Sequence, residues 1–389
     1  MIQSILDNDL YKLTMQQAVL AAAPDAEVVY KFKNRRPEKQ VNKAMFSGIQ
    51  QDIEQLAKLK MDAVEHDWLA KECAFFNPAY LEYLANYRFN PDELILDHND
   101  NELSLTIKGL WHSTIMWEVP LMAIISRNHF LHSDKSWNKK KTPEKQEAKA
   151  LQKAKNLSDA GCLWADFGTR RRRNYESQNR IVETHKNYKG FVGTSNVHLA
   201  CKHGVKPIGT MAHEWIMAGS VLWSLRHANR YALAEWGKIY HGQLGIALTD
   251  TFGTPAFFND FDQQLAREYD GVRHDSADPF TFADQVIQYY RSLGIDPASK
   301  SIVFSDSLNT ELAIELQQFC HGRIKCSFGI GTHFSNDYEG SPALNIVIKI
   351  SEINGVPVVK LSDDEGKATG DKNAVRVAKW TFGLGGLDE

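Results

Sequence analysis

Cysteine is scarce in this chain, and long apolar runs are missing. The five cysteines among 389 residues are scattered and include no Cys-x-x-Cys pair, which argues against a disulfide framework or a zinc ribbon. The longest apolar stretch, residues 115–126, contains Glu118 and Pro120 and is far shorter than the roughly 20 residues of a membrane-spanning helix. Residues 1–13 lack the pattern of a secretory signal. We therefore expect a cytoplasmic protein without a membrane segment.

An excess of positive charge is also missing. Lys and Arg number 45 against 48 Asp and Glu, a net charge of −3, so the chain lacks the broad basic face of a nucleic-acid binder. Hydrophobic residues make up 43% of the chain, which is ordinary for a folded protein, and the length suits one large or two ordinary domains. We expect no nucleic-acid partner, and any anion site has to be local.

Two common motifs are absent. The Gly-Lys pairs at 237–238 and 366–367 are followed by Ile and Ala, so neither completes a Walker A sequence. His213 and Glu214 begin like a zinc metalloprotease motif, but Met217 stands where the second histidine is required. A P-loop and a zincin site are therefore not expected.

Both ends of the chain predict a mixed α/β unit. A strand pair joined by the turn Asn354-Gly355 is predicted over 344–361, and we expect it to pack back on the N-terminal domain. The Lys-rich stretch 132–156 is most simply a helix with one solvated face. Helices are further predicted over 10–22 and 44–59, and strands over 28–32 and 103–107.

From residue 161 onward, short apolar runs recur, each ending in small or charged residues and followed by a helical pattern. Strands of α/β barrels are buried and nearly continuously apolar, and the loops at their carboxyl ends build the active site. The pattern predicts an α/β fold with a barrel of roughly seven strands and one mouth. We expect an N-terminal α/β domain (1–125), the barrel (126–340) and a returning C-terminal segment (341–389). The seven runs are 162–167, 190–192, 205–208, 246–248, 271–272, 302–304 and 324–328.

A run of four arginines, residues 170–173, follows the first of these strands. Guanidinium groups bind phosphate or carboxylate through two parallel hydrogen bonds, which suits a small anionic substrate. Such a run also occurs in nucleic-acid binders, which the net charge disfavours. We expect at least two of the four to face solvent or to pair with Glu176 and Glu183.

His213 stands in the first turn of a helix that follows a strand. The positive end of a helix favours an anion, including a phosphoryl group on the imidazole itself. A hydrogen-bonded structural histidine is the alternative at this point.

Three carboxylates and a glycine loop end the later strands. Asp250, Asp275 and Asp306 could bind ribose hydroxyls or hold Mg²⁺ beside a substrate phosphate, and helix capping is the alternative for any one of them. Gly329 and Gly331 belong to a loop whose free N–H groups can surround a phosphate.

Eight segments, in this order and spacing, make the chain resemble the nicotinate phosphoribosyltransferases: DLYKLTM (9–15), DFGTRRR (166–172), GTSNVHLA (193–200), GTMAHEW (209–215), LTDTFGT (248–254), GVRHDSADP (271–279), SDSLN (305–309) and FGIGTHF (328–334).

The resemblance implies a type II phosphoribosyltransferase, with an N-terminal α/β domain and an irregular, roughly seven-stranded α/β barrel. Such enzymes make nicotinate mononucleotide and pyrophosphate from nicotinate and phosphoribosyl pyrophosphate, coupled to ATP hydrolysis through a phosphohistidine. It further implies Mg²⁺, ATP as co-substrate, no tightly bound organic cofactor, and a homodimer with shared active sites. In that arrangement Tyr11 reaches the barrel mouth of the partner subunit.

The resemblance also implies roles for residues. His213 corresponds to the phosphorylated histidine, and Tyr11 and Phe167 to the aromatics that sandwich the pyridine ring. Arg273 corresponds to a nicotinate contact and, with Asp275, to the catalytic set, while Thr210 corresponds to a donor in the same pocket. The ribose and phosphates would be surrounded by Arg170, Asp250, Asp275, Ser305, Asp306, Gly329, Gly331 and Thr332, with Asp250, Asp275 and Asp306 as candidate metal ligands.

Two alternatives stay open at this point. A nicotinamide phosphoribosyltransferase would share the fold, the histidine and the chemistry, but the arginines near the pocket favour a carboxylate over a neutral amide. A catalytically silent nucleotide-binding regulator on the same fold is the alternative from another class, because fold does not fix function. Retention of His213, Arg273, Asp275 and Tyr11 argues against it.

Overall fold

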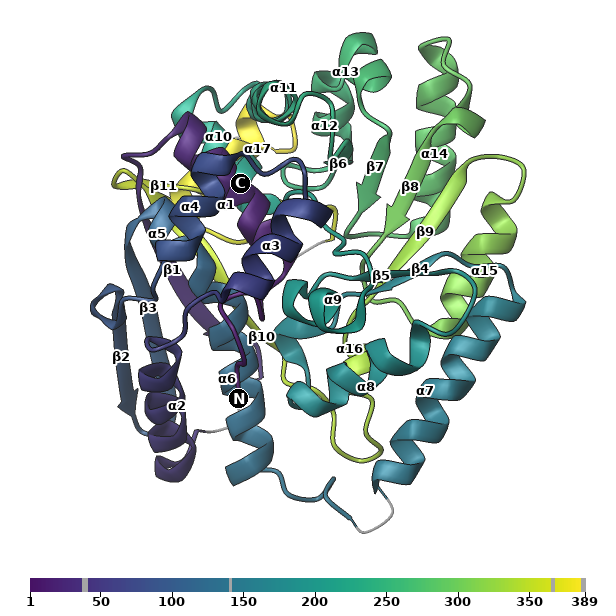
Figure 1. Cartoon of the computed structure of the whole chain (residues 1–389). Helices are drawn as coiled ribbons and strands as arrows, with labels where there is room; N and C mark the ends of the chain where they lie inside the picture. The colour runs from purple at the N-terminus through teal and green to yellow at the C-terminus, as the bar shows by residue number, and fades with distance from the viewer. Residues whose placement is uncertain (37–40, 140–141, 365–367, 386–389) are drawn as a thin grey trace.

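Two β-sheets lie side by side in the chain, one antiparallel and one mostly surrounded by helices (Figure 1). The computed structural model describes residues 1–36, 41–139, 142–364 and 368–385. The antiparallel sheet has the order β11-β10-β1-β3-β2, with β1 Glu27–Asn34, β2 Leu94–Asn99, β3 Glu102–Leu110, β10 Ile346–Ile353 and β11 Val356–Pro357.

The C-terminal strands pair with the N-terminal ones. Strand β10 lies antiparallel to β1, with Tyr30 opposite Ile350, although more than 300 residues separate the two in sequence. The turn between β10 and β11 is formed by Asn354 and Gly355, both at positive φ (49° and 75°), as a tight hairpin requires. The predicted hairpin is therefore present and joins the sheet of the N-terminal unit.

The second sheet is parallel and has six strands among the described residues. Their order is β5-β4-β9-β8-β7-β6, and their carboxyl ends meet at one edge. The strands are β4 Trp164–Asp166, β5 Phe191–Thr194, β6 Ile246–Leu248, β7 Gly271–His274, β8 Ser301–Phe304 and β9 Lys325–Ile330.

The predicted closed barrel of seven strands is not confirmed. In the described part of the chain, the edge strands β5 and β6 do not pair with each other, and the run 205–208 makes only an isolated parallel bridge between Pro207 and Thr194. Proline has no N–H to continue a ladder, which explains why this run does not extend into a strand. The chain then crosses toward β6, where the Thr210 hydroxyl donates to the Ile246 carbonyl (3.3 Å).

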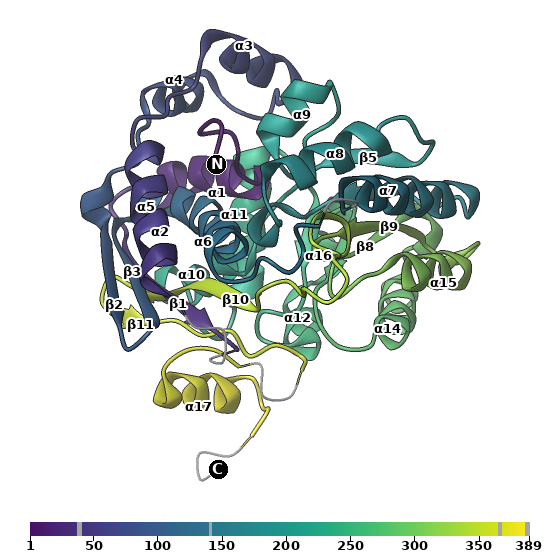
Figure 2. The ribbon, with the colours of Figure 1, turned by 90° about the horizontal axis from the view of Figure 1, so that it is seen from below.

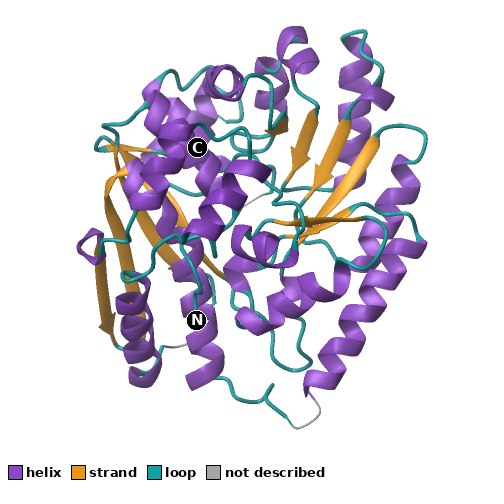
Figure 3. Ribbon diagram, in the orientation of Figure 1, coloured by secondary structure: helices purple, strands orange, loops and turns teal. Residues whose placement is uncertain are grey.

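Helices cover both sheets (Figures 2 and 3). Helix α1 is placed as predicted, and the Lys-rich helix is α7, which begins ten residues later than predicted. The helices are α1 Leu10–Ala22, α2 Lys43–Leu56, α3 Ala63–Glu72, α4 Pro78–Asn86, α5 Trp111–Thr114, α6 Glu118–His132, α7 Thr142–Asp159, α8 Tyr175–His185, α9 Val197–His203, α10 His213–Leu222, α11 Ala228–Tyr240, α12 Thr254–Asp260, α13 Gln263–Glu268, α14 Pro279–Ser292, α15 Thr310–Cys320, α16 Thr332–Ser335 and α17 Lys372–Thr381.

Neither membrane spans nor disulfides organise this fold. Across the described ranges, every helix is too short or too polar to cross a membrane. The cysteines at 73, 162, 201, 320 and 326 are all free thiols.

Two of the four arginines of the 170–173 run are structural. Arg172 is buried and donates to both oxygens of Asp7 (2.8 Å each), which ties the N-terminal segment to the loop after β4. Arg173 is also buried, lies over the rings of Phe130 and Tyr338, and donates to Ser341. Neither of these two arginines faces solvent or pairs with a glutamate of α8, because their partners Asp7 and Ser341 lie far away in sequence; of the other two, Arg170 is exposed and Arg171 is half-buried.

The Arg172 ion pair should contribute strongly to stability. Replacing Arg172 by Met leaves the buried Asp7 carboxylate without its partner, which costs about 3–5 kcal/mol for a buried pair. As a control, Arg230→Met removes the pair with Asp262, whose side chains are 53% and 36% exposed, and should cost less than about 1 kcal/mol. Urea unfolding of the two variants measures both free energies of unfolding. Equal losses of stability in the two variants would contradict a structural role for the Arg172–Asp7 pair.

Candidate active site

The predicted site residues meet in a cavity of about 820 Å³ at the carboxyl edge of the parallel sheet. Residues of α1 and β10 complete its walls, so both sheets contribute to it. Asp250 and Gly329 lie behind the lining, the first against His213 and the second against Phe167. The other eleven of the thirteen predicted residues line the cavity: Tyr11, Phe167, Arg170, Thr210, His213, Arg273, Asp275, Ser305, Asp306, Gly331 and Thr332.

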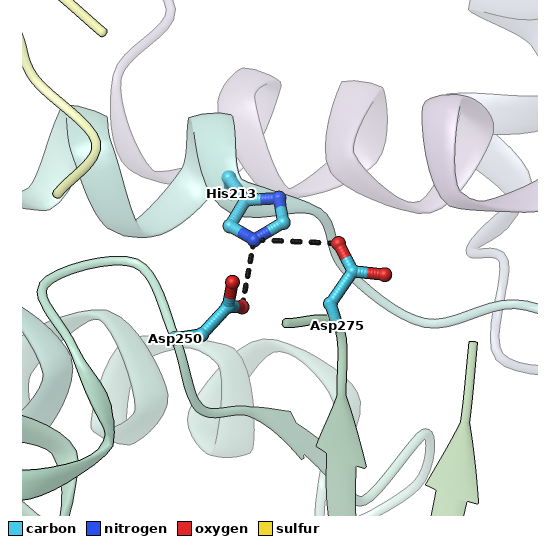
Figure 4. A group of neighbouring side chains, drawn as sticks. All are labelled: His213, Asp250 and Asp275. Atoms are coloured by element: carbon cyan, nitrogen blue, oxygen red, sulfur yellow. Dashed lines mark hydrogen bonds and ion pairs between the residues drawn. The ribbon is translucent and has the colours of Figure 1, made fainter. Parts of the chain in front are cut away.

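His213 is the first residue of α10 and points toward two carboxylates (Figure 4). Its Nε2 is 2.9 Å from Asp250 Oδ1 and 3.5 Å from Asp275 Oδ2. An ionised carboxylate only accepts, so Nε2 carries the proton and Nδ1 keeps its lone pair. Burial and the positive charge of Lys360 lower the pKa of His213 against the opposing effect of the carboxylates. The imidazole is thus a neutral nucleophile held by one nitrogen.

Asp250 is fully engaged behind this histidine. Its Oδ1 accepts from His213, and its Oδ2 accepts from Ser276 (2.6 Å) and Lys360 (2.7 Å). Burial alone would raise the pKa of Asp250, but His213 and Lys360 outweigh it and hold the pKa well below its usual range. Asp250 is therefore an ionised carboxylate, both of whose oxygens accept hydrogen bonds from protein groups.

Asp275 and Arg273 face the cavity from the end of β7. Asp275 Oδ1 accepts from Ser305 (2.7 Å); burial raises its pKa, but Arg273 and His213 outweigh burial, so the net pKa is lowered. Arg273 Nη1 donates to the Met211 carbonyl (2.9 Å), while its Nε is buried without a partner. Arg273 also lines the cavity, and a guanidinium at a cavity wall is a ready contact for an anion.

Four cationic side chains, those of Arg170, Arg171, Arg273 and Lys349, line the cavity together with six carboxylates. Lys349 on β10 faces it, and burial with the nearby charges of Lys360 and Arg35 lowers the pKa of Lys349 to about 8. Burial and the neighbouring Arg170 likewise lower the pKa of Arg171 to about 10. Mutual repulsion of this kind favours the binding of an anion between the groups.

Tyr11 and Phe167 line the cavity of one and the same chain. The expectation that Tyr11 reaches the mouth of a partner subunit was therefore wrong, because α1 lies against the elements that carry the site in its own chain: Thr14 donates to the Thr210 carbonyl (2.6 Å). Thr210 also lines the cavity, with its hydroxyl proton engaged by Ile246.

Gly329 packs against the Phe167 ring. A Cβ at this position would lie 2.3 Å from Phe167 Cε2 and 2.4 Å from Cδ2. Gly329 is therefore not among the residues that line the cavity, whereas Gly331 and Thr332 of the same loop are.

A buried ion cluster beside the site was missed in the sequence. Lys12 Nζ lies 2.5 Å from Glu214 Oε1 and 2.6 Å from Glu118 Oε2, and Tyr30 donates to Glu214 Oε2 (2.8 Å). Glu214 therefore neither faces solvent nor contacts His213. A lysine inside an otherwise apolar helix face was the only signal, because its partners lie 106 and 202 positions away.

A cavity with several arginines and a lysine in its lining, two aromatic walls and a carboxylate-held histidine, at the carboxyl edge of a parallel sheet, defines an α/β enzyme site that can take a small anionic substrate. Sequence models agree with this class: the nicotinate phosphoribosyltransferase (NAPRTase) N-terminal domain matches residues 6–126, and the nicotinate phosphoribosyltransferase (NAPRTase) family matches residues 162–386. The chain belongs to the nicotinate phosphoribosyltransferase family, and the predicted resemblance is confirmed.

Named relatives extend over the whole chain. Nicotinate phosphoribosyltransferases of Methanosarcina mazei and Chromohalobacter salexigens are 49% and 41% identical, covering 100% and 99% of this chain and 100% and 99% of their own. Among solved structures, the enzyme from Porphyromonas gingivalis superposes with a TM-score of 0.94 at 34% identity, over 98% of this chain and 100% of its own. That from Vibrio cholerae gives 0.93 at 34%, over 100% and 95%.

Gly329→Ala should displace the Phe167 ring. The added methyl group overlaps the ring at 2.3 Å, and the φ of Gly329 suits alanine, so the effect is purely steric. A crystal structure of the variant should show the ring moved by about 1 Å or more, with about 1–3 kcal/mol lost in unfolding. The matched change Gly237→Ala, on helix α11 with open space around it, should be neutral or slightly stabilising. An unmoved ring would refute this role.

Proposed function

We propose that this chain synthesises nicotinate mononucleotide and pyrophosphate from nicotinate and phosphoribosyl pyrophosphate, a step of NAD salvage, with ATP hydrolysis coupled through His213. The observation that carries the proposal is the His213–Asp250–Asp275 cluster at the wall of a cavity that is lined by Tyr11, Phe167 and several arginines. The full-length identity to nicotinate phosphoribosyltransferases supports it, and the nicotinamide alternative is not favoured.

The pyridine ring of nicotinate binds between Tyr11 and Phe167, since aromatic walls suit an aromatic substrate. Its carboxylate faces the Arg273 guanidinium at the cavity wall. The phosphates of the second substrate lie against Arg170, Arg171 and Lys349, with Gly331 and Thr332 offering loop donors, and the ribose lies near Ser305 and Asp306.

Transfer itself needs positioning more than covalent help. The pyridine nitrogen attacks the anomeric carbon while the bond to the pyrophosphate oxygen breaks, and the electron pair leaves with pyrophosphate. The transition state carries positive charge on the sugar and growing negative charge on the leaving group. The cavity cations stabilise that leaving group, and Asp275 faces the developing positive charge.

ATP acts on His213. The Nδ1 lone pair attacks the γ-phosphorus, and the bond to the β-phosphate oxygen breaks with departure of ADP. The ring then bears a positive charge that Asp250 offsets through Nε2–H. Phosphorylation of a residue at the cavity wall biases the enzyme toward a form that binds the other substrates more tightly.

Magnesium suits the carboxylates at this site. Carboxylate oxygens beside substrate phosphates are its usual ligands, and Asp275 and Asp306 line the cavity, whereas Asp250 lies behind His213. Held by Asp275 and Asp306, Mg²⁺ would neutralise part of the pyrophosphate charge.

The remaining features of the proposal concern the whole molecule. We place its three parts at 1–125, 126–340 and 341–389, with the parallel sheet as an irregular barrel, in a cytoplasmic homodimer. Family-model boundaries at 6–126 and 162–386 support the first division.

Wild-type enzyme should use nicotinate in preference to nicotinamide. Loss of a charge-assisted pair with Arg273 costs about 1.5–3 kcal/mol, which corresponds to roughly tenfold to over a hundredfold in kcat/KM. Pyrophosphate release with nicotinate, with nicotinamide or without an acceptor measures this preference. Arg273→Met should lower the ratio of kcat/KM for nicotinate to that for nicotinamide. Equal use of acid and amide by the wild type would favour the nicotinamide enzyme, and no acceptor-dependent release at all would favour the silent regulator.

Mixed subunits should not complement each other. Tyr11 and His213 line one cavity of one chain, so a hybrid of Tyr11→Ala and His213→Ala subunits contains no intact site. After subunit exchange by mild denaturation and refolding, we expect no ATP-stimulated formation of nicotinate mononucleotide above the separate proteins. Exchanged wild-type subunits serve as control, and restored stimulation would demonstrate a shared site.

A further inference from the structure

Lys360 reaches the back of the active site from the C-terminal part of the chain. It is buried, and its Nζ lies 2.7 Å from Asp250 Oδ2, on the opposite side of that carboxylate from His213. It does not line the cavity, so it is not placed to contact a substrate. No part of the sequence patterns that point to the site includes it, since these end at residue 334.

A segment that we call the C-terminal strap, residues 358–364, carries Lys360 to this position. Leu361 N donates to the Thr251 carbonyl (2.8 Å), one residue beyond Asp250. Asp363 accepts from both the N–H and the hydroxyl of Thr254 (2.7 and 2.6 Å), at the start of α12. Lys360 itself exchanges two backbone hydrogen bonds with Thr369. The strap is thus joined to the loop after β6 at several points, which fixes the base of the Lys360 side chain.

Asp250 links Lys360 on one side to His213 on the other through its two carboxylate oxygens. Lys360 and Ser276 donate to Oδ2, which fixes the plane of the carboxylate, and Oδ1 is left to receive the His213 proton. A carboxylate without these donors could rotate about its own side chain, and the imidazole that depends on it would lose its orientation. The hydrogen bond to Nε2 is what leaves Nδ1 facing away from the carboxylates.

We infer that Lys360 is a positioning residue for the phosphorylation of His213: through Asp250 it holds the imidazole so that Nδ1, and not Nε2, attacks the γ-phosphorus of ATP. The inference rests on the proposed function, since it concerns the same phosphoryl transfer. In that transfer the Nδ1–phosphorus bond forms, the γ-phosphorus–oxygen bond breaks, ADP leaves with its electron pair, and the proton stays on Nε2 against Asp250. The C-terminal strap thereby belongs to the ATP-coupling part of the enzyme although it touches no substrate.

The test compares three full-length variants with the wild type. Lys360→Met removes the ammonium at nearly constant length, and Lys360→Arg keeps a charged donor. Lys300→Met is the matched control, because Lys300 is equally buried but its ammonium donates to the backbone carbonyls of Arg267 and Tyr269, away from the site. Each protein is incubated with γ-labelled ATP, and the rate of labelling and the phosphohistidine isomer in an alkaline digest are measured.

We expect label on Nδ1 alone in the wild type and in Lys300→Met. Lys360→Met should be labelled at about one tenth of the wild-type rate, an effect of about 1.4 kcal/mol on the barrier. It should carry the label on both Nδ1 and Nε2, because the imidazole is no longer held in one orientation. Lys360→Arg should restore Nδ1 as the single position. Should the methionine variant not fold, Lys360→Gln, with a shorter neutral donor, serves in the same comparison.

Several results would overturn the inference. Lys360→Met labelled at the wild-type rate and on Nδ1 alone would show that Asp250 needs no second partner. Slow labelling confined to Nδ1, unrescued by Lys360→Arg and matched by Lys300→Met, would reduce Lys360 to a contributor to stability. A wild-type protein that forms nicotinate mononucleotide but takes up no label would contradict the phosphohistidine intermediate and this inference. The proposed transferase activity would still stand.

Discussion

Lys12 carries its ammonium into the interior of the protein, where it lies between Glu118 and Glu214 at 2.6 and 2.5 Å. The three residues belong to α1, α6 and α10, so one buried charge joins the N-terminal segment, the helix that follows the antiparallel sheet, and the helix that begins with His213. Removing one partner of such a buried group costs about 3–5 kcal/mol, because the remaining charges stay buried without compensation. The position of both site-bearing helices relative to the cavity depends on this contact.

The ion cluster around Lys12 positions site residues that are adjacent to its members in sequence. Tyr11 precedes Lys12 and His213 precedes Glu214, so the aromatic wall and the phosphoryl acceptor are both placed by the same ion cluster. Glu118 extends the cluster to the cavity surface, where it lies 3.6 Å from Arg170. On the other side, Lys360, Asp250 and His213 form a second row of alternating charge and hydrogen bonds. The cavity between the two rows keeps four cationic side chains, including Lys349, and these cations can bind phosphates.

Much of this arrangement could be predicted where the signals are local. Helix α1 has the predicted bounds, and the Asn354-Gly355 hairpin has the predicted turn, because periodicity and turn residues act over a few positions. The carboxyl ends of the parallel strands also follow from apolar runs that stop at small or charged residues, which is why most site residues were found. Their family resemblance supplied the roles, which no pattern contains.

Other features depend on contacts between distant parts of the chain and could not be predicted from it. Arg172 and Arg173 look like their two neighbours in sequence, yet their partners Asp7 and Ser341 lie 165 and 168 positions away. Lys360 and Lys12 reach the site across 110 and more than 100 positions, with nothing in the local pattern to mark them. At Pro207, by contrast, a local property explains the structure. Proline has no backbone N–H, and the run 205–208 forms an isolated bridge with Thr194 instead of a further strand of the sheet.

The central claim is that His213, neutral and held at Nε2 by Asp250, accepts a phosphoryl group from ATP. It is tested most directly by incubating wild type and His213→Asn with γ-labelled ATP and measuring acid-labile, base-stable label together with nicotinate mononucleotide formation. The account predicts label on the wild type alone, and for the variant no ATPase activity but slow transfer that ATP does not stimulate, because the cavity cations and Asp275 remain. Equal labelling of both proteins, or full ATP stimulation in the variant, would contradict it.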